Sequence, residues 1–239
     1  MTVSFPEFNE GRLKNAKPTG MRPAAAVAGH VTVAPTERGF YRLFFKRLFD
    51  VTAILLAAPV VVPLILVAAV LVAMDGANPF YAQMRVGKGG RWFWMWKLRS
   101  MVHDADDRLE AHLAAHPEAR AEWDSAQKLK DDPRVTRVGR FLRKSSLDEL
   151  PQLWNVLKGE MSLVGPRPMM ISQQHLYPGK AYYALRPGIT GYWQTAGRNR
   201  TTFAARVEYD TAYEAELSFA KDLNLLIDTV GVVMKGTGY

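Results

Sequence analysis

The sequence predicts an α+β protein in which a re-entrant membrane helix hairpin precedes a small, mainly helical cytosolic domain. Three observations predict it: a charge-free apolar run at residues 51–74, a Gly-rich turn between two strand-like runs at residues 80–99, and helical patterns rich in Ala and charge beyond residue 100. We divide the 239 residues into a flexible tail (1–37), a basic flank with the membrane hairpin (38–75) and a cytosolic domain (76–239). The tail mixes Pro, Gly and Ala without a lasting period, which favours flexibility.

Net charge and cysteine content limit the classes of function. The formal net charge is +8, 48% of residues are hydrophobic, and there is no cysteine. The charge points to an anionic partner, which is nucleic acid, a phospholipid surface or a phosphorylated substrate. The absence of cysteine excludes disulfides, thiol catalysis and zinc ribbons, so a cytosolic setting is the default.

The apolar run is long enough to cross a membrane, but its prolines and flanks favour another arrangement. As a straight helix it would reach about 36 Å. Pro59 and Pro63 lie one turn apart in its middle, where each removes a backbone donor and bends the helix. Both flanks are basic, as cytosolic flanks are. A bent helix that spans the membrane is the alternative, but we favour a re-entrant hairpin that keeps both flanks in the cytosol. The flanking cations are Arg38, Arg42, Lys46 and Arg47 before the run, and Arg85, Lys88, Arg91, Lys97 and Arg99 after it.

A β-hairpin and several helices are predicted after the membrane segment. Residues 80–85 and 91–99 flank the turn at 87–90, and we expect Trp92, Trp94 and Trp96 to combine core packing with a place at the membrane interface. Residues 101–126 are helical in pattern, with a break at Pro117. A further helix at about 149–158 ends at Gly159. Amphipathic helices follow, one capped by Thr201 or Thr202 and running to about 217, the other at 222–235 on the core or the membrane.

Two adjacent carboxylates, Asp148 and Glu149, are the most informative local feature. Acidic residues are common at helix starts, and either a capping box of Ser146 with Glu149 or an N-cap at Asp148 would explain them. The alternative is a nucleophile or metal ligand among phosphate binders. Arginine binds phosphate through a planar, permanently charged fork. The candidate phosphate binders are Lys97, Arg99, Arg134, Arg137, Arg140, Arg143, Arg167, Arg186 and Arg198.

Phosphoryl chemistry at a bilayer accounts for the charge and the apolar run together. No nucleic-acid reading element is visible, so nucleic acid is not expected as a partner. No Walker or Rossmann glycine loop is present, which argues against ATP-driven or NAD-linked activity. Asp104 and Asp106 resemble the metal-binding pair of nucleotide-sugar glycosyltransferases, but acids on an Ala-rich helix are usually solvated.

Eight short motifs follow one another in order along the chain: residues 46–50 (KRLFD), 97–101 (KLRSM), 132–136 (DPRVT), 139–143 (GRFLR), 146–152 (SLDELPQ), 159–162 (GEMS), 165–168 (GPRP) and 186–191 (RPGITG). Together they resemble the bacterial sugar transferase family of monotopic polyprenyl-phosphate phosphoglycosyl transferases. The resemblance covers about four-fifths of the chain, and the pattern is most similar to that of the exopolysaccharide-initiating members that load galactose or glucose phosphate. Ala58 stands where the family often has Ser before the hairpin proline.

The resemblance implies transfer of hexose 1-phosphate from a UDP-sugar to undecaprenyl phosphate, with release of UMP, on the cytosolic face of the bacterial inner membrane. Asp148 would form a covalent phosphosugar intermediate. Glu149 would assist by binding Mg²⁺ or positioning the acceptor, and both carboxylates are candidate Mg²⁺ ligands. The basic residues named above, together with Gln194, would bind substrate. Assembly into a homo-oligomer is a further possibility that the sequence does not decide. Two competing hypotheses are a non-catalytic membrane adaptor and a conventional metal-dependent glycosyltransferase that uses Asp104 and Asp106.

Overall fold

The structure is a computed structural model that describes residues 39–74, 76–102, 104–126, 129, 131–197 and 203–234. All of these residues belong to one compact unit. They form helices around two small sheets, which confirms a mixed helix-and-sheet fold. The predicted tail, residues 1–37, lies outside the described residues.

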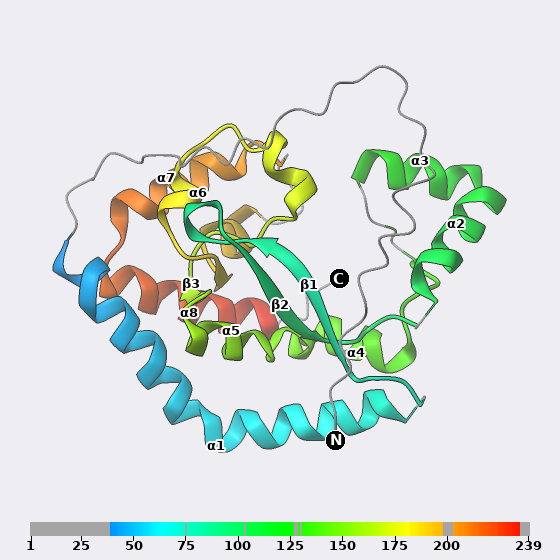
Figure 1. The fold of residues 1–239 in the computed structure, drawn as a ribbon, viewed down its shortest axis with the longest axis horizontal. Helices are drawn as coiled ribbons and strands as arrows, with labels where there is room; N and C mark the ends of the chain where they lie inside the picture. The colour runs from blue at the N-terminus through cyan, green and yellow to red at the C-terminus, as the bar shows by residue number, and fades with distance from the viewer. Residues whose placement is uncertain are drawn as a thin grey trace. The chain divides into compact units, whose positions relative to one another are not determined.

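The apolar run is a single continuous helix. The π-helical turn η2 (Tyr41–Phe45) leads into α1 (Lys46–Ala73), which contains both Pro59 and Pro63. In Figure 1, α1 changes direction near its middle. We expected a hairpin, but the chain stays helical through the bend. Each proline removes one backbone hydrogen bond, and the bonds on either side hold the helix together.

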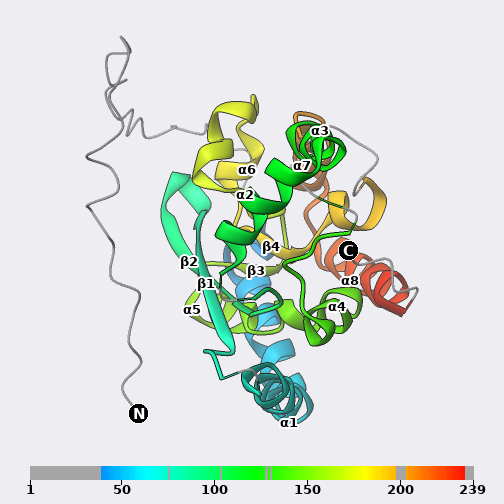
Figure 2. The same cartoon turned by 90° about the vertical axis from the view of Figure 1, so that its right-hand side faces the viewer.

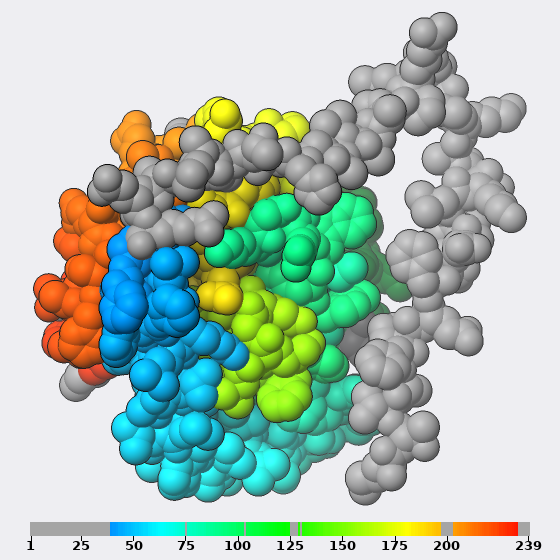
Figure 3. Space-filling view, turned by 60° about the vertical axis from the view of Figure 1, so that its left-hand side comes forward, coloured from blue at the N-terminus to red at the C-terminus, as the bar shows by residue number. Residues whose placement is uncertain are grey.

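Both ends of α1 pack against the rest of the unit, whereas its middle does not. Lys46, Asp50 and Ile54, spaced four apart, are buried near the start, and Ala68, Ala69 and Val72 are buried near the end. No residue from 55 to 67 is buried. The segment Tyr41–Ala73 is long and apolar enough to cross a membrane by length and composition, and only 17% of its most apolar window is buried. Figure 3 shows this helix, in blue and cyan, beside the yellow-green surface of residues 150–160.

Polar contacts fix the first turns of α1. Asp50 Oδ2 accepts a hydrogen bond from Ser162 Oγ (2.8 Å), and its Oδ1 accepts one from the Leu163 N–H (3.1 Å). Lys46 Nζ lies 2.6 Å from Asp222 Oδ2 and donates to the Tyr213 hydroxyl at 2.9 Å. The apolar helix is therefore tied by buried charge to strands and helices far along the chain.

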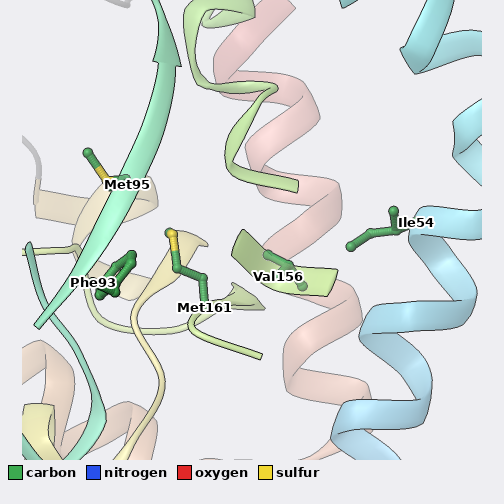
Figure 4. Packing of buried hydrophobic residues seen from close by; sticks show 5 residues of the cluster. All are labelled: Ile54, Phe93, Met95, Val156 and Met161. Atoms are coloured by element: carbon green, nitrogen blue, oxygen red, sulfur yellow. The ribbon is translucent and has the colours of Figure 1, made fainter. Parts of the chain in front are cut away.

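The predicted β-hairpin is confirmed. Strands β1 (Phe80–Val86) and β2 (Trp92–Leu98) pair antiparallel, from Phe80 opposite Leu98 to Val86 opposite Trp92. Alternation sends Phe93 and Met95 into the core, where they pack with Ile54, Val156 and Met161 (Figure 4). Trp92 and Trp94 point the other way and are at least half exposed, so the expectation that they pack in the core is wrong.

Several predicted helix boundaries are confirmed, while the helices at Arg137–Lys144 and Ala181–Ala184 were not predicted. The break at Pro117 is confirmed, because α2 ends at Ala115 and α3 begins at the proline. Gly159 ends α5 in the left-handed conformation, as predicted. The predicted caps Thr201 and Thr202 lie outside the described residues. The α-helices after the hairpin are α2 (Ala105–Ala115), α3 (Pro117–Ala126), α4 (Arg137–Lys144), α5 (Gln152–Lys158), α6 (Ala181–Ala184), α7 (Arg206–Glu216) and α8 (Phe219–Met234).

A short parallel strand pair, which we did not predict, lies between the hairpin and α8 (Figure 2). β3 (Ser162–Val164) pairs with β4 (Gly188–Thr190). The chains approach so closely that a Cβ on Gly165 would lie 2.3 Å from the Arg186 carbonyl oxygen, and one on Gly188 would lie 2.1 Å from the Gly165 nitrogen. Only glycine fits at these two positions, and their contact fixes the loop that carries Arg167.

Candidate active site

A cavity of about 990 Å³ lies between the hairpin, the segment joining α4 to α5, β4 and α8. Its polar lining includes Lys97, Arg143, Asp148, Glu149 and Arg167. The fold thus brings together residues that are up to 70 positions apart in sequence. A large concave site with converging charges is the expected form of a substrate pocket.

The two carboxylates sit on a tight turn and not at a capped helix start. Ser146 has φ 56°, the one positive φ among the described non-glycine residues, and its side chain makes no capping hydrogen bond. A 3-10 turn, η4 (Leu147–Glu149), follows, and α5 begins only at Gln152 with Pro151 as its N-cap. Both capping explanations are therefore wrong. A left-handed serine costs roughly 1–3 kcal/mol, and such strain is concentrated at functional sites.

Lys97, which lies on β2, contacts both carboxylates of the acidic pair. Its Nζ lies 2.7 Å from Glu149 Oε1 and 3.6 Å from Asp148 Oδ2. Asp148 is 7% exposed. Burial raises the pKa of Asp148 above its ordinary value, Lys97 opposes that shift, and Glu149 adds to it. At neutral pH, the lysine therefore favours the ionised form that a carboxylate nucleophile requires.

Arg143 supplies a second cation near Asp148. Its Nε donates to Ser100 Oγ at 2.8 Å, and its charge lowers the pKa of Asp148. Burial lowers the pKa of Arg143 itself, while Asp148 and Asp132 oppose that shift. Arg143 comes from the last turn of α4, so a helix only eight residues long places it beside the carboxylates.

Arg99 and Arg134 line the same cavity, but each makes strong contacts within the protein. Arg99 donates from Nε to the Asn78 carbonyl (2.8 Å) and from a terminal nitrogen to the Val72 carbonyl (3.3 Å), which joins the hairpin to the end of α1. Arg134 forms a two-pronged pair with Asp132, at 2.8 and 2.7 Å. These contacts tie both arginines to the scaffold.

The other predicted site residues are divided between the cavity lining and the rest of the molecule. Arg137 and Arg140 are exposed on α4, and Arg186 donates from Nε to the Gly159 carbonyl at 3.0 Å. Gln194 is buried and lines the cavity. Arg198 lies outside the described residues. Asp104 is half exposed and pairs with Arg108 at 2.9 Å, while Asp106 lines the cavity.

The fold adds two arginines that we had not placed in the site. Arg85 lines the cavity from β1, and Arg206, at the start of α7, lies over the ring of Trp193, which also lines it. Alternation along β1 puts Arg85 on the same face as Tyr81 and Gln83, which are also cavity residues. That alternation was a usable signal for Arg85. Nothing local distinguishes Arg206 from an ordinary helix-start arginine.

The carboxylates also fit one kind of metal site. Among the residues that the structure describes, no group of three or more His, Asp or Glu side chains could hold a metal ion. Mg²⁺ is usually held by one or two carboxylates together with substrate phosphates. Asp148 and Glu149 meet that requirement, while a cage made by protein ligands alone does not occur in the described part of the chain.

The chain belongs to the bacterial sugar transferase family. Residues 41–236 match the sequence profile of that family. A UDP-galactose-lipid carrier transferase of Erwinia amylovora is 46% identical over 197 residues, which make up 82% of this chain and 41% of that protein. An undecaprenyl-phosphate galactose phosphotransferase of Salmonella typhimurium is 44% identical over the same proportions. The chain therefore spans about two-fifths of the length of these curated relatives.

A shorter relative is covered almost completely. The exopolysaccharide production protein ExoY of Rhizobium meliloti is 42% identical over 224 residues, which make up 91% of this chain and 99% of that protein. The family match includes α1, the hairpin and every described residue of the cavity.

Proposed function

We propose that this chain transfers hexose 1-phosphate, galactose or glucose phosphate, from a UDP-sugar to undecaprenyl phosphate and releases UMP. The observation that carries the proposal is Asp148, a buried carboxylate that faces Lys97 and Glu149 in a basic cavity. One relative is named an undecaprenyl-phosphate galactose phosphotransferase and another a UDP-galactose-lipid carrier transferase, and both names support this substrate class.

The reaction proceeds in two displacements at phosphorus. In the first, an Asp148 oxygen bonds to the sugar-linked phosphorus, and the bond to the bridging oxygen breaks, so that UMP leaves with the electron pair. In the second, an oxygen of undecaprenyl phosphate bonds to the same phosphorus, and Asp148 leaves as a free carboxylate. The products are UMP and the lipid-linked hexose diphosphate, and no redox partner is needed.

Most of the catalysis comes from positioning and charge. Lys97 keeps Asp148 ionised and neutralises charge that builds on the phosphoryl oxygens. Glu149 orients Lys97 through its 2.7 Å contact and, with Asp148, would hold Mg²⁺ against the donor phosphates. Bound there, Mg²⁺ would neutralise phosphate charge.

We infer that the chemistry takes place at the cytosolic surface of the inner membrane, and the bent helix supports this. Both ends of α1 pack on one compact unit, through Ile54 at one end and Val72 at the other. A helix held in this way keeps its two ends on one side of a bilayer. The exposed apolar residues between them then enter a single leaflet, as a re-entrant segment does. Labelling of both flanks from the cytosol tests this topology, and labelling of only one flank contradicts it.

A nucleotide-product assay tests the proposed reaction against its alternatives. Full-length protein in lipid is incubated with undecaprenyl phosphate, Mg²⁺ and a panel of UDP-sugars, and the released nucleotide is identified by chromatography. We expect UMP. Release of UDP would indicate the conventional glycosyltransferase that uses Asp104 and Asp106. No release with any donor would favour a membrane adaptor.

A further inference from the structure

Three arginines from distant parts of the chain lie near one another at one end of the cavity, where Arg85 and Arg167 line it and Arg206 lies against the lining residue Trp193. Arg85 lies on β1, Arg167 lies in the loop after β3, and Arg206 is the first residue of α7. The guanidinium carbons of Arg167 and Arg206 lie 5.8 and 4.2 Å from the Trp193 ring centroid. Burial, and after it the charge of Arg167, lowers the pKa of both Arg85 and Arg206 to about 10. The three positive charges therefore interact with one another.

This arginine cluster (Arg85, Arg167 and Arg206) has an excess of positive charge. Among the described residues, no carboxylate lies within 4.0 Å of any of its guanidinium groups. Asp210 and Glu149 act on it from farther away, and Glu149 is already paired with Lys97. Repulsion among half-buried cations destabilises the folded protein unless an anion offsets it.

The cluster also holds donors that have no acceptor. The Nε atoms of Arg85 and Arg206 are buried and make no hydrogen bond. A buried donor without a partner costs about 1–3 kcal/mol, so two of them next to a cavity point to an acceptor supplied by a ligand. Phosphate oxygens match arginine donors in geometry and in charge.

The position of the cluster along the hairpin indicates which phosphate it holds. Leu98, at the opposite end of the hairpin, packs against Ala68, Ala69 and Val72 of α1. Lys97 pairs with Tyr81 near that end, while Arg85 lies four positions farther along β1, roughly 13 Å away along the strand. Arg85 therefore lies apart from the acidic pair along the same cavity, where it can reach the part of the donor that Asp148 does not attack.

We infer that Arg85, Arg167 and Arg206 bind the phosphate that remains on the nucleotide when the UDP-sugar is cleaved. The inference rests on the proposed function, since it takes Asp148 as the group that attacks the sugar-linked phosphorus. The cluster holds the second phosphate of the same diphosphate, and it neutralises the charge that develops on that phosphate as UMP leaves. Trp193 supports two of the guanidinium groups through cation–π contact.

Binding of product to the full-length protein tests this site without turnover. Affinities for UMP and for uridine, which lacks the phosphate, are measured by calorimetry in detergent. We expect Arg85→Gln and Arg206→Gln each to weaken UMP binding by about tenfold or more and to leave uridine binding unchanged. Arg91→Gln is the matched control, because Arg91 is exposed beside the turn of the same hairpin. Unchanged UMP affinity in both cluster variants would overturn the inference.

Two further measurements keep the outcome decisive. If the variants fail to fold, as judged by thermal unfolding, equal affinities of the wild-type protein for UMP and uridine would overturn the site. In the second measurement, the affinity of the wild-type protein and of the two cluster variants for a short-chain polyprenyl phosphate is compared. If the variants lose affinity for it and keep affinity for UMP, the nucleotide assignment is wrong. UMP binding is independent of UMP release from UDP-sugars, so the site can fail while the proposed reaction stands, and the reaction can fail while the site stands.

Discussion

The two ends of the cavity carry similar side chains but balance their charges differently. At one end, Lys97 lies between two carboxylates, so that cation and anions offset each other within 3.6 Å. At the other, Arg85 and Arg206 have buried donors without acceptors, and neighbouring arginines shift each other's pKa downward. At the Lys97 end, the charges of the side chains offset one another, so these side chains can act on a substrate without needing an ion to neutralise them. At the arginine end, the uncompensated positive charge favours binding of an anion. This difference supports our proposal that the cavity holds a diphosphate at two points, one reactive and one fixed.

The largest effect is expected at the balanced end. Asp148→Asn removes the proposed nucleophile and should lower UMP release by at least about 10³-fold, since loss of a covalent catalyst typically has effects of that size. Initial rates at saturating donor measure it. Asp104→Asn is the matched control, because Asp104 is half exposed and pairs with Arg108. A larger loss in the control than in Asp148→Asn would contradict the assignment.

Glu149→Gln should be the next most damaging change. It removes a carboxylate 2.7 Å from Lys97 Nζ and leaves the lysine to pair with Asp148 alone. We expect a loss of about 10²-fold in turnover, or about 2.7 kcal/mol. The same assay measures it. If activity stays within about tenfold, Glu149 has only a structural role.

Gly165→Ala should disturb the scaffold of the arginine end. The added Cβ would lie 2.3 Å from the Arg186 carbonyl oxygen, and backbone atoms cannot yield as a flexible side chain can. We expect a loss of about 2–3 kcal/mol in the free energy of unfolding, measured by denaturant titration. The control is Gly231→Ala in α8, where a Cβ meets nothing within 4 Å. Alanine there should be neutral or stabilise by about 0.5–1 kcal/mol. Equal losses in the two variants would show that the close approach is not the cause.

A smaller, pH-dependent effect is expected from Asp210, which lies beside the arginine cluster. Burial raises the pKa of Asp210 to about 6, against hydrogen bonding from the Tyr177 hydroxyl and the charge of Arg206. The folded protein then binds the proton more tightly than the unfolded chain, so this group stabilises the fold below about pH 4 and loses that contribution as the pH rises to about 6. Across that range the loss is roughly 2 kcal/mol.

Denaturant titrations between pH 4 and pH 7 measure the contribution of Asp210. In Asp210→Asn, the part of the pH dependence that comes from this carboxyl should disappear. A variant whose stability still falls by the same amount between pH 4 and pH 6 would assign the effect to another group.

Local features were predictable from sequence where the pattern itself carries the physics. The glycines at 87–90 specified the β-hairpin, Pro117 separated two helices, and Gly159 ended α5. The acidic pair was found because its neighbours are basic. The backbone conformation of this pair was not predicted, since a serine rarely adopts the left-handed conformation that Ser146 has and is held there by the surrounding packing.

Long-range features were harder to predict. The β3–β4 pair is three residues long on each side, too short to give a period, and it forms because glycines allow the backbones to touch. Arg85 and Arg206 meet Arg167 across more than 30 residues of chain, so sequence neighbourhood gives no sign of the cluster. Several predicted arginines instead fasten the scaffold, as Arg134 does through Asp132. Residue type indicated phosphate binding, but only the fold separates arginines that face the cavity from those that do not.

The most direct test of the account is the mass of the protein after incubation with donor alone. With a UDP-hexose and Mg²⁺ but no lipid acceptor, we expect a covalent hexose phosphate adduct on a peptide that contains Asp148, and its disappearance when undecaprenyl phosphate is added. Asp148→Asn should form no adduct. Undiminished turnover in that variant, or an adduct on another residue of the wild-type protein, would contradict the role of Asp148.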